Sequence, residues 1–159
     1  MSTPAWVYPN ICLGAGASLT PFFVNTNRVT HVINCAYSEN SPAWFQRAYP
    51  SRYAQLDAHD DVRVKILDWY PAFETAMRTF LRAPNAVVFV HCQAGINRSA
   101  FLLLYFMCKN FGLDFPTLLA AVRKQRPQIC QNPAFMQEVT DALKAPKDPK
   151  DPKDPKAST

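Results

Sequence analysis

The sequence has little of what membrane proteins, secreted disulfide-linked proteins and structural zinc sites require. None of its apolar runs approaches the roughly 20 residues of a membrane span. The start, MSTPAWVYPN, has neither the basic nor the apolar region of a signal peptide. The five cysteines are odd in number and unclustered, and no two have the CxxC spacing of a zinc site. This usage is typical of a reducing compartment, so we expect a protein of the cytoplasm or nucleus with no membrane span, no disulfide framework and no zinc site.

The excess of one charge sign is also small. The 159 residues carry 17 Lys and Arg against 12 Asp and Glu, a formal net charge of +5. Such a charge suits an anionic substrate, but it is too small and too scattered to indicate nucleic-acid binding. The length fits one domain with a sizeable core, and we expect this domain to be a monomer.

Large apolar side chains are absent from the C-terminal segment, which reads APKDPKDPKDPKAST from Ala145. Proline at every third position removes backbone donors and blocks helices, and nothing in the repeat can fill a core. We therefore predict that residues 145–159 form an extended, disordered tail, and that the folded domain spans residues 1–144.

Residues 1–144 alternate between strand-like and helix-like patterns. Strands are predicted over 6–14, 29–35 and 52–56, and the continuous apolar run AVVFVHC over 86–92 indicates a fully buried central strand. Apolar residues at helical spacing predict helices over 66–83 and 99–111, and further helices begin after Asp114 and Pro133. This alternation predicts an α/β fold with a central mixed sheet of about four to five strands flanked by helices.

The stretch VHCQAGINRSA, residues 90–100, lies where the central strand ends and a buried helix begins. Ligands of such sheets bind beyond the carboxyl ends of the strands. Gly95 permits a left-handed turn, so backbone N–H groups of the loop can point inward toward an anion at the start of the helix. Arg98 offers a planar fork for two phosphate oxygens. The same surroundings favour a nucleophilic thiolate at Cys92.

Two neighbours are expected to support this loop. We interpret His91 as a group that orients the loop and favours the thiolate rather than as a base, and Ser99 can hydrogen-bond the sulfur.

A lone buried cysteine is usually inert packing, and we interpret Cys12, Cys108 and Cys130 in that way. A cysteine, a five-residue loop with a central glycine and then Arg-Ser, all between a strand and a helix, is far rarer. The catalytic interpretation is therefore preferred.

The segment HCQAGINRS resembles the signature of the cysteine-dependent phosphatases, and specifically of the compact dual-specificity phosphatases. The resemblance covers residues 6 to about 143. VYPNICLG is similar to the opening strand of that family, THVINCA to its second strand and RPQICQNPAFMQEV to its closing segment. Asn97 stands where most cellular members carry Ser, and here the loop is similar to compact poxvirus-type members and to RNA 5′-triphosphatases.

The resemblance implies that phosphate monoesters are hydrolysed through a phosphocysteine on Cys92, without a metal. It assigns phosphate binding to the loop residues Gln93, Ala94, Gly95, Ile96, Asn97 and Arg98.

The family chemistry also requires a general acid on a separate loop. The stretch YAQLDAHDDVRVKILDWY offers four candidates, Asp57, Asp60, Asp61 and Asp68. The family's spacings from the aromatic residues at both ends of this stretch lead to Asp60. Asp61 is the alternative, because a slip of one residue in the loop would exchange the two. Asp57 is interpreted as a strand-end residue and Asp68 as a helix cap.

These residues leave several substrates open. Proteins phosphorylated on tyrosine and on serine or threonine are the leading expectation, because the chain lacks the long N-terminal region that builds a deep pocket in tyrosine-specific relatives. An RNA 5′-triphosphatase or diphosphatase, with nucleic acid as partner, is favoured by Asn97 but opposed by Gln93 and Ala94, where those relatives have Thr-His. Lipid-directed relatives place lysines in the loop, which has none here. A phosphoprotein-binding pseudophosphatase is disfavoured, because Cys92, Arg98 and an acid candidate are all present.

Cys35 ends the second predicted strand as Cys92 ends the central one. If the two strands are neighbours, both sulfurs open toward one crevice, and Cys35 could trap a sulfenic acid on Cys92 as a disulfide. Some phosphoinositide-phosphatase relatives use a cysteine at the corresponding strand end in this way. The alternative is that Cys35 is simply a small buried side chain.

Overall fold

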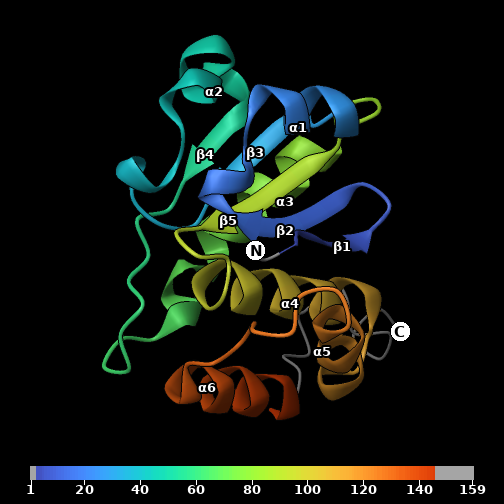
Figure 1. The fold of residues 1–159 in the computed structure, drawn as a ribbon. Coiled ribbons are helices and arrows are strands. Elements are labelled where there is room, and N and C mark those ends of the chain that lie inside the picture. Colours follow the sequence, from blue (N-terminus) through green and yellow to red (C-terminus); the bar gives the residue numbers. More distant parts are fainter. Residues whose placement is uncertain (1–2, 146–159) are drawn as a thin grey trace.

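The computed structural model describes residues 3–145 (Figure 1). Its strands are β1 (Ala5–Tyr8), β2 (Ile11–Ala15), β3 (His31–Asn34), β4 (Tyr53–Gln55) and β5 (Val88–Cys92). They form a five-stranded sheet in the order β1-β2-β5-β3-β4. β1 runs antiparallel to β2, and all other neighbours are parallel. The predicted α/β fold with a central mixed sheet is confirmed. The predicted tail, apart from Ala145, lies outside the described residues.

Helices cover both faces of this sheet. They are α1 (Pro21–Asn27), α2 (Ala43–Ala48), α3 (Tyr70–Leu81), α4 (Arg98–Phe111), α5 (Phe115–Arg123) and α6 (Pro133–Lys144). α1 and α2 lie on one side of the sheet, and α4, α5 and α6 lie on the other (Figure 1). α3 packs with this second group, because Phe73 contacts Phe106 of α4 edge to face.

The alternation of side chains along the strands divides the core in two. Cys12, Phe89 and Val32 lie side by side on three neighbouring strands and pack in the smaller core with α1 and α2. The next residue of each strand points the opposite way, into the larger core with α3 to α6. The central strand β5 is therefore buried on both faces, as its continuous apolar run predicts.

The prediction of a single strand over 6–14 is wrong. The chain turns between Tyr8 and Ile11, which pair with each other, and the two halves form the antiparallel hairpin of β1 and β2. Pro9 stands in this turn, where its missing N–H costs no ladder hydrogen bond. The short helices α1 and α2 were not predicted, since seven and six residues are too few for a clear helical pattern.

The helix on which the site depends is α4, which is buried almost along its whole length between the sheet and the other helices. It ends at Gly112, with φ +64. α5 begins where the Asp114 carboxylate accepts a hydrogen bond from the Thr117 N–H at 3.1 Å, and the proline after Phe115 lies in its first turn. In the part of the chain that is described, no helix combines the length and apolar character of a membrane span.

Candidate active site

Residues 92–98, called the phosphate loop because the sequence predicts phosphate binding there, run from the last residue of β5 to the first residue of α4. At the centre of this loop Gly95 has φ +67, the left-handed conformation that the sequence predicts. A Cβ atom here would lie 2.3 Å from the carbonyl oxygen of Gly14 in β2. A larger residue would therefore push the loop away from the sheet. Glycine lets the loop lie at the carboxyl end of β5, beside the N-terminal end of α4.

The Cys92 side chain lies at the base of the loop and is 2% exposed. Its sulfur accepts a hydrogen bond from the Ser99 hydroxyl at 3.2 Å. Ser99 belongs to the first turn of α4, so the helix start presents a donor to the sulfur. The contact between Ser99 and the sulfur is the one expected from the sequence.

His91 is fully buried directly before the cysteine. Desolvation lowers the pKa of this histidine to about 4, so its ring is neutral at pH 7. Nδ1 lies 2.9 Å from the Cys92 carbonyl oxygen, which can only accept, so Nδ1 carries the proton. Nε2 then accepts a hydrogen bond from the Ser41 hydroxyl at 3.1 Å. A neutral ring fixed at both nitrogens orients the end of β5 and has no free nitrogen to act as a base.

Arg98 is 7% exposed and reaches toward the loop that follows β4. Its Nη1 donates to the Ala58 carbonyl oxygen at 3.1 Å, and its guanidinium carbon lies 5.4 Å from the centre of the Tyr37 ring. Its Nε–H is buried without a hydrogen-bond partner among residues 3–145. An unpaired buried N–H costs free energy. This group is therefore a donor available to a bound anion.

Residues 56–65, called the acid loop because the sequence predicts the general acid there, follow β4 and bring one aspartate to the phosphate loop. The Asp60 carboxylate accepts a hydrogen bond from Asn97 Nδ2 at 2.9 Å and another from Asn132 Nδ2 at 3.0 Å. Asp60 is thus the aspartate of the acid loop that meets the Cys92–Arg98 segment.

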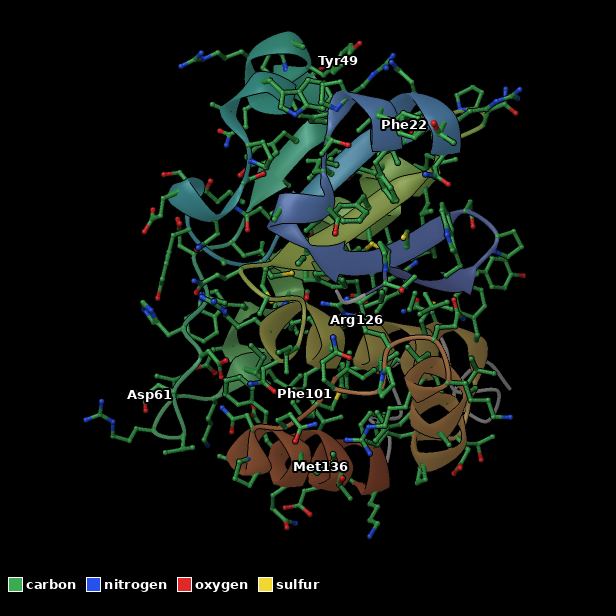
Figure 2. The ribbon with its side chains drawn as sticks, in the orientation of Figure 1. Phe22, Tyr49, Asp61, Phe101, Arg126 and Met136 are labelled. Carbon is green, nitrogen blue, oxygen red and sulfur yellow. The ribbon has the colours of Figure 1, made fainter. Side chains whose placement is uncertain are left out.

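Asp61 faces away from the phosphate loop. It accepts hydrogen bonds from the Arg63 side chain at 3.0 Å and 2.7 Å, and it lies at the outer edge of the acid loop (Figure 2). The hydrogen bonds from Arg63 lower the pKa of Asp61 to about 2, away from the range that suits a proton donor near neutral pH. Asp57, predicted to end the strand, lies two residues after the last residue of β4; it has φ +57 and accepts from the Gln55 side chain at 2.8 Å.

Three rings hold the start of the acid loop. The Tyr37 hydroxyl hydrogen-bonds Nδ1 of His59. The His59 ring also contacts Trp69 edge to face, with ring centres 5.4 Å apart. Because Tyr37 also lies beside the Arg98 guanidinium, these rings join the residue before Asp60 to the phosphate site.

Cys35 lies beside Cys92. β3 and β5 are parallel neighbours, with Asn34 opposite His91, and the next residues are Cys35, directly after β3, and Cys92, the last residue of β5. The Cys35 N–H donates to the His91 carbonyl oxygen at 2.7 Å, and both cysteines are free and buried. Burial raises the pKa of Cys35 well above its usual value, so this group is a thiol at pH 7. In-register neighbours lie within the Cα separation that a disulfide spans, about 4.4–6.8 Å.

Comparison with known proteins identifies the family. Residues 11–144 match the family described as dual specificity phosphatase, catalytic domain. The chain belongs to this family.

Similar proteins in this family are longer than the chain. Mouse dual specificity protein phosphatase 19 is 33% identical over 116 residues, which cover 71% of this chain and 49% of the relative. Human dual specificity protein phosphatase 16 is 26% identical over 139 residues, covering 87% of this chain and 20% of the relative. The chain thus spans half or less of the length of these two relatives.

Solved structures share the fold of this phosphatase domain. Human DUSP28 has a TM-score of 0.75 at 23% identity, and the match covers 91% of this chain and 97% of that one. The human tyrosine phosphatase-like serine/threonine/tyrosine-interacting protein also has a TM-score of 0.75 at 23% identity, covering 87% and 94%. At this identity the likeness concerns the fold alone.

The phosphatase domain holds its phosphate loop with an arginine that sequence reasoning missed. Arg126 is fully buried, between the sheet and the helices α4 and α5 (Figure 2). Its Nε donates to the Gly95 carbonyl oxygen at 2.8 Å, its Nη2 to that of Ala94, and its Nη1 to that of Thr3 at 3.0 Å. Because Arg126 binds the carbonyl oxygens of Ala94 and Gly95, the N–H groups of the loop can point to the opposite side, where an anion would bind.

Asn132 was also missed; it lies in residues 129–132, the four residues before α6, hereafter called the closing segment. The Cys130 N–H of this segment donates to the Ile96 carbonyl oxygen at 2.7 Å. The side-chain oxygen of Asn97 accepts hydrogen bonds from the Gln131 and Asn132 N–H groups at 2.8 Å and 2.9 Å. The only sequence signal was that Asn132 precedes a proline at a helix start, which indicates a cap and not a contact with the acid loop.

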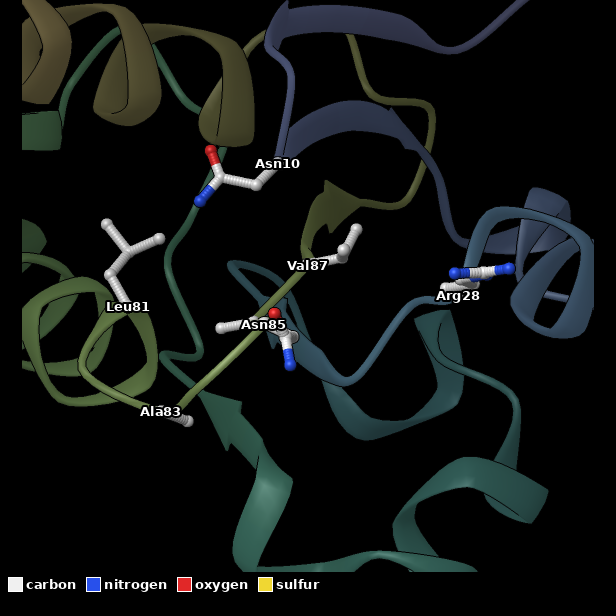
Figure 3. A pocket seen from close by; sticks show the side chains of 7 residues that line it. Asn10, Arg28, Leu81, Ala83, Asn85 and Val87 are labelled. Atoms are coloured by element: carbon white, nitrogen blue, oxygen red, sulfur yellow. The ribbon is translucent and has the colours of Figure 1, made fainter.

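Elsewhere in the domain, an open hollow of about 480 Å³ lies at the opposite end of β5 (Figure 3). It is lined by Asn10, Arg28, Leu81, Ala83, Asn85, Ala86 and Val87. None of these residues belongs to the phosphate loop, the acid loop or the closing segment. Within residues 3–145, no three His, Cys, Asp or Glu side chains are grouped closely enough to hold a metal ion.

Proposed function

We propose that this protein is a dual-specificity protein phosphatase, a hydrolase that cleaves phosphate monoesters of phosphotyrosine and of phosphoserine or phosphothreonine in proteins. The observation that carries the proposal is the meeting of three groups at one end of the sheet. The Cys92 sulfur lies at the base of the phosphate loop, Arg98 has an unpaired buried Nε–H, and Asp60 is held against Asn97. A nucleophile, an anion-binding donor and a proton donor are the groups that the reaction requires.

The first step transfers the phosphoryl group to the enzyme. The Cys92 thiolate attacks phosphorus in line with the leaving oxygen, so that an S–P bond forms as the P–O bond breaks. Asp60 gives its proton to the departing oxygen, which leaves as the hydroxyl group of the dephosphorylated side chain. Arg98 and the backbone N–H groups of residues 93–97 bind the remaining phosphoryl oxygens, more tightly as charge redistributes in the transition state.

The second step releases phosphate. The Asp60 carboxylate takes a proton from water as the water oxygen attacks phosphorus, and the S–P bond breaks. Ser99, whose hydroxyl already donates to the sulfur, stabilises the departing thiolate. His91 keeps the end of β5 in place through its two ring nitrogens and does not exchange a proton.

Several further properties belong to the same proposal. The names of similar proteins, among them dual specificity protein phosphatases 19 and 16, support phosphorylated proteins as substrates. Asn97 supports a kinship with compact poxvirus-type members. The five free cysteines support a reducing compartment, the cytoplasm or nucleus. We propose a monomeric enzyme without a cofactor.

The nucleophile is tested by Cys92→Ser, with Cys108→Ser as the matched control. Cys108 is also a free buried cysteine, on α4. Cys92→Ser is expected to abolish hydrolysis of an aryl phosphate and still bind inorganic phosphate, whereas Cys108→Ser keeps activity. Vanadate should inhibit the wild type and EDTA should not. Appreciable turnover by Cys92→Ser would sink the assignment, and so would a metal requirement.

The substrate class is tested with a panel. Phosphotyrosyl and phosphothreonyl peptides are compared with 5′-triphosphorylated RNA and phosphoinositides at equal concentration. We expect both peptides to be hydrolysed faster than the RNA or the lipid. Faster release of phosphate from the RNA would establish the RNA 5′-phosphatase that Asn97 also fits. Binding of phosphopeptide without turnover would establish a pseudophosphatase.

We further propose that Cys35 protects Cys92 from irreversible oxidation. A hydroperoxide oxidises the Cys92 thiolate to a sulfenic acid and leaves as its alcohol or water. The Cys35 thiol then attacks the sulfenic sulfur, an S–S bond forms, and the oxygen leaves as water with the thiol proton. The positions of the two cysteines, each directly after the paired residues Asn34 and His91, support this reaction.

After mild peroxide treatment, the wild type should recover its activity on reduction by a thiol. Cys35→Ser should recover much less, because its sulfenic acid is oxidised further. Cys108→Ser is the control and should recover as the wild type does. Equal recovery of wild type and Cys35→Ser would mean that Cys35 is only a packing residue.

A further inference from the structure

The Asp60 carboxylate is held by two side chains from distant parts of the chain. Residues 57–61, on both sides of it, form no helix or strand, so the local backbone alone does not fix where this carboxylate lies. Asn97 Nδ2 donates to one carboxylate oxygen at 2.9 Å. Asn132 Nδ2 donates to the other oxygen at 3.0 Å. Backbone hydrogen bonds hold the preceding residues, since the Asp57 and Ala58 N–H groups donate to the Ala36 and Cys35 carbonyl oxygens, and the two amides hold the Asp60 carboxylate itself against the phosphate loop.

Neither amide is free to turn round. The Asn97 side-chain oxygen accepts from two backbone N–H groups of the closing segment. The Asn132 side-chain oxygen accepts from the Ala134 and Phe135 N–H groups at the start of α6, at 3.0 Å and 3.2 Å. A backbone N–H can bond only to the oxygen of an amide, so in both side chains the NH₂ group must face Asp60.

This arrangement leaves the carboxylate able to carry a proton. Each carboxylate oxygen has two lone-pair sites and accepts one amide hydrogen bond here, so one site on each oxygen stays available. The carboxyl group is thus restrained in position without being blocked.

On the basis of the proposed phosphatase function, we infer that Asn97 and Asn132 are positioning residues that hold Asp60 for proton transfer to the leaving group. Asn97 performs this task with both ends of its side-chain amide. Its amide presents an oxygen to the closing segment and a nitrogen to Asp60. A serine has a single oxygen close to the main chain and cannot reach both. Asn97 therefore joins the phosphate loop, the closing segment and the acid loop in one contact.

The test compares Asn97→Ser and Asn132→Ser with the wild type on two aryl phosphates. One substrate has a strongly acidic phenol, which leaves without much help, and the other has a weakly acidic phenol, which needs the acid. Serine at position 132 is itself a good helix N-cap, so Asn132→Ser keeps α6 capped and removes only the donor to Asp60. Asn27→Ser is the matched control, since the amide of Asn27 donates to the Phe23 carbonyl oxygen in α1, outside the phosphate loop, acid loop and closing segment.

For the weakly acidic phenol, kcat should fall by ~10-fold or more in each positioning variant, with little change in KM. The reason is that a misplaced acid stabilises the transition state less and leaves substrate binding unchanged. For the strongly acidic phenol, the fall should stay below about 3-fold. Asn27→Ser should match the wild type on both. Thermal unfolding of each variant shows that it is folded.

The same two substitutions are then made in an Asp60→Asn protein. If they act through Asp60, neither lowers kcat further, since the group that they position is gone. Equal losses on both substrates would overturn the inference and indicate a merely structural role, and so would undiminished losses in the Asp60→Asn background. A much larger fall of kcat for the weakly acidic phenol than for the strongly acidic one in Asp60→Asn, with no effect of either asparagine variant, overturns this inference and leaves the phosphatase function standing. Absence of turnover in the wild type would overturn both.

Discussion

Adjacent residues of the acid loop have different surroundings. Asp60 is bound by two amides from other segments, whereas Asp61 is paired with Arg63 at the surface. We expect Asp60→Ala to lower kcat by ~10²–10⁴-fold for a substrate with a poor leaving group, the usual size of general acid catalysis. Asp61→Ala is the matched control and should change kcat little. If the control shows the large loss and Asp60→Ala does not, Asp61 is the acid.

Another single residue links stability to pH. Burial lowers the pKa of His91 from 6.5 to about 4. Between these values the unfolded chain binds a proton that the folded protein does not, so unfolding becomes easier as the pH falls from 6.5 to 4. Above and below this window His91 adds no pH dependence. Across this pH window the free energy of unfolding falls by on the order of 3 kcal/mol.

Urea unfolding at several pH values checks this prediction in the wild type and in His91→Asn. Asparagine keeps a donor for the Cys92 carbonyl oxygen but does not titrate. The free energy of unfolding should therefore depend less on pH in the variant than in the wild type between pH 6.5 and 4. Burial also lowers the pKa of His31, but that residue is present in both proteins and cancels in the comparison. Equal pH dependence would contradict the assignment.

At the scale of elements, the phosphate loop depends on Arg126 of the segment that follows α5. Arg126→Met would leave the carbonyl oxygens of Ala94 and Gly95 without this donor in the interior. We expect a loss of ~2–4 kcal/mol in the free energy of unfolding, since buried groups lose charge-assisted hydrogen bonds. Affinity for vanadate should fall as well, because the loop is no longer held open.

Arg78→Met provides the comparison for this loss. Arg78 bonds Asn110 at the surface, and such a substitution should change stability by less than about 0.5 kcal/mol. Urea denaturation and vanadate inhibition measure the two effects of Arg126→Met separately. Unchanged vanadate inhibition would mean that the loop keeps its shape without Arg126.

At the scale of the whole molecule, the folded unit is expected to need none of the Lys-Asp-Pro repeat. α6 ends at Lys144, and Phe135 and Val139 bury its apolar face in the larger core. Truncation after Lys144 should therefore leave the thermal unfolding temperature and aryl phosphatase activity nearly unchanged. A large fall in either quantity would show that the repeat stabilises the domain.

Sequence patterns predicted those parts that short stretches of chain determine. The apolar run of β5 and the phosphate loop after it occupy consecutive residues, so their composition alone indicates a buried strand, a left-handed glycine and the start of a helix. Asp114 caps α5 as expected, because its partner Thr117 is three residues away. The hairpin of β1 and β2 was missed, because a turn as short as Pro9-Asn10 interrupts the strand pattern only briefly.

The sequence by itself thus determined the α/β class, the central strand and the loop in which Cys92 and Arg98 lie six residues apart. Only the tertiary structure decided which aspartate meets that loop, which arginine holds it from behind, and that Cys35 lies beside Cys92. Asp60 is 37 positions from Asn97 and 72 positions from Asn132. Arg126 is 31 positions from Gly95. Periodicity and capping act within a few residues. A buried hydrogen bond between distant segments forms only after the packing of both cores has brought them together.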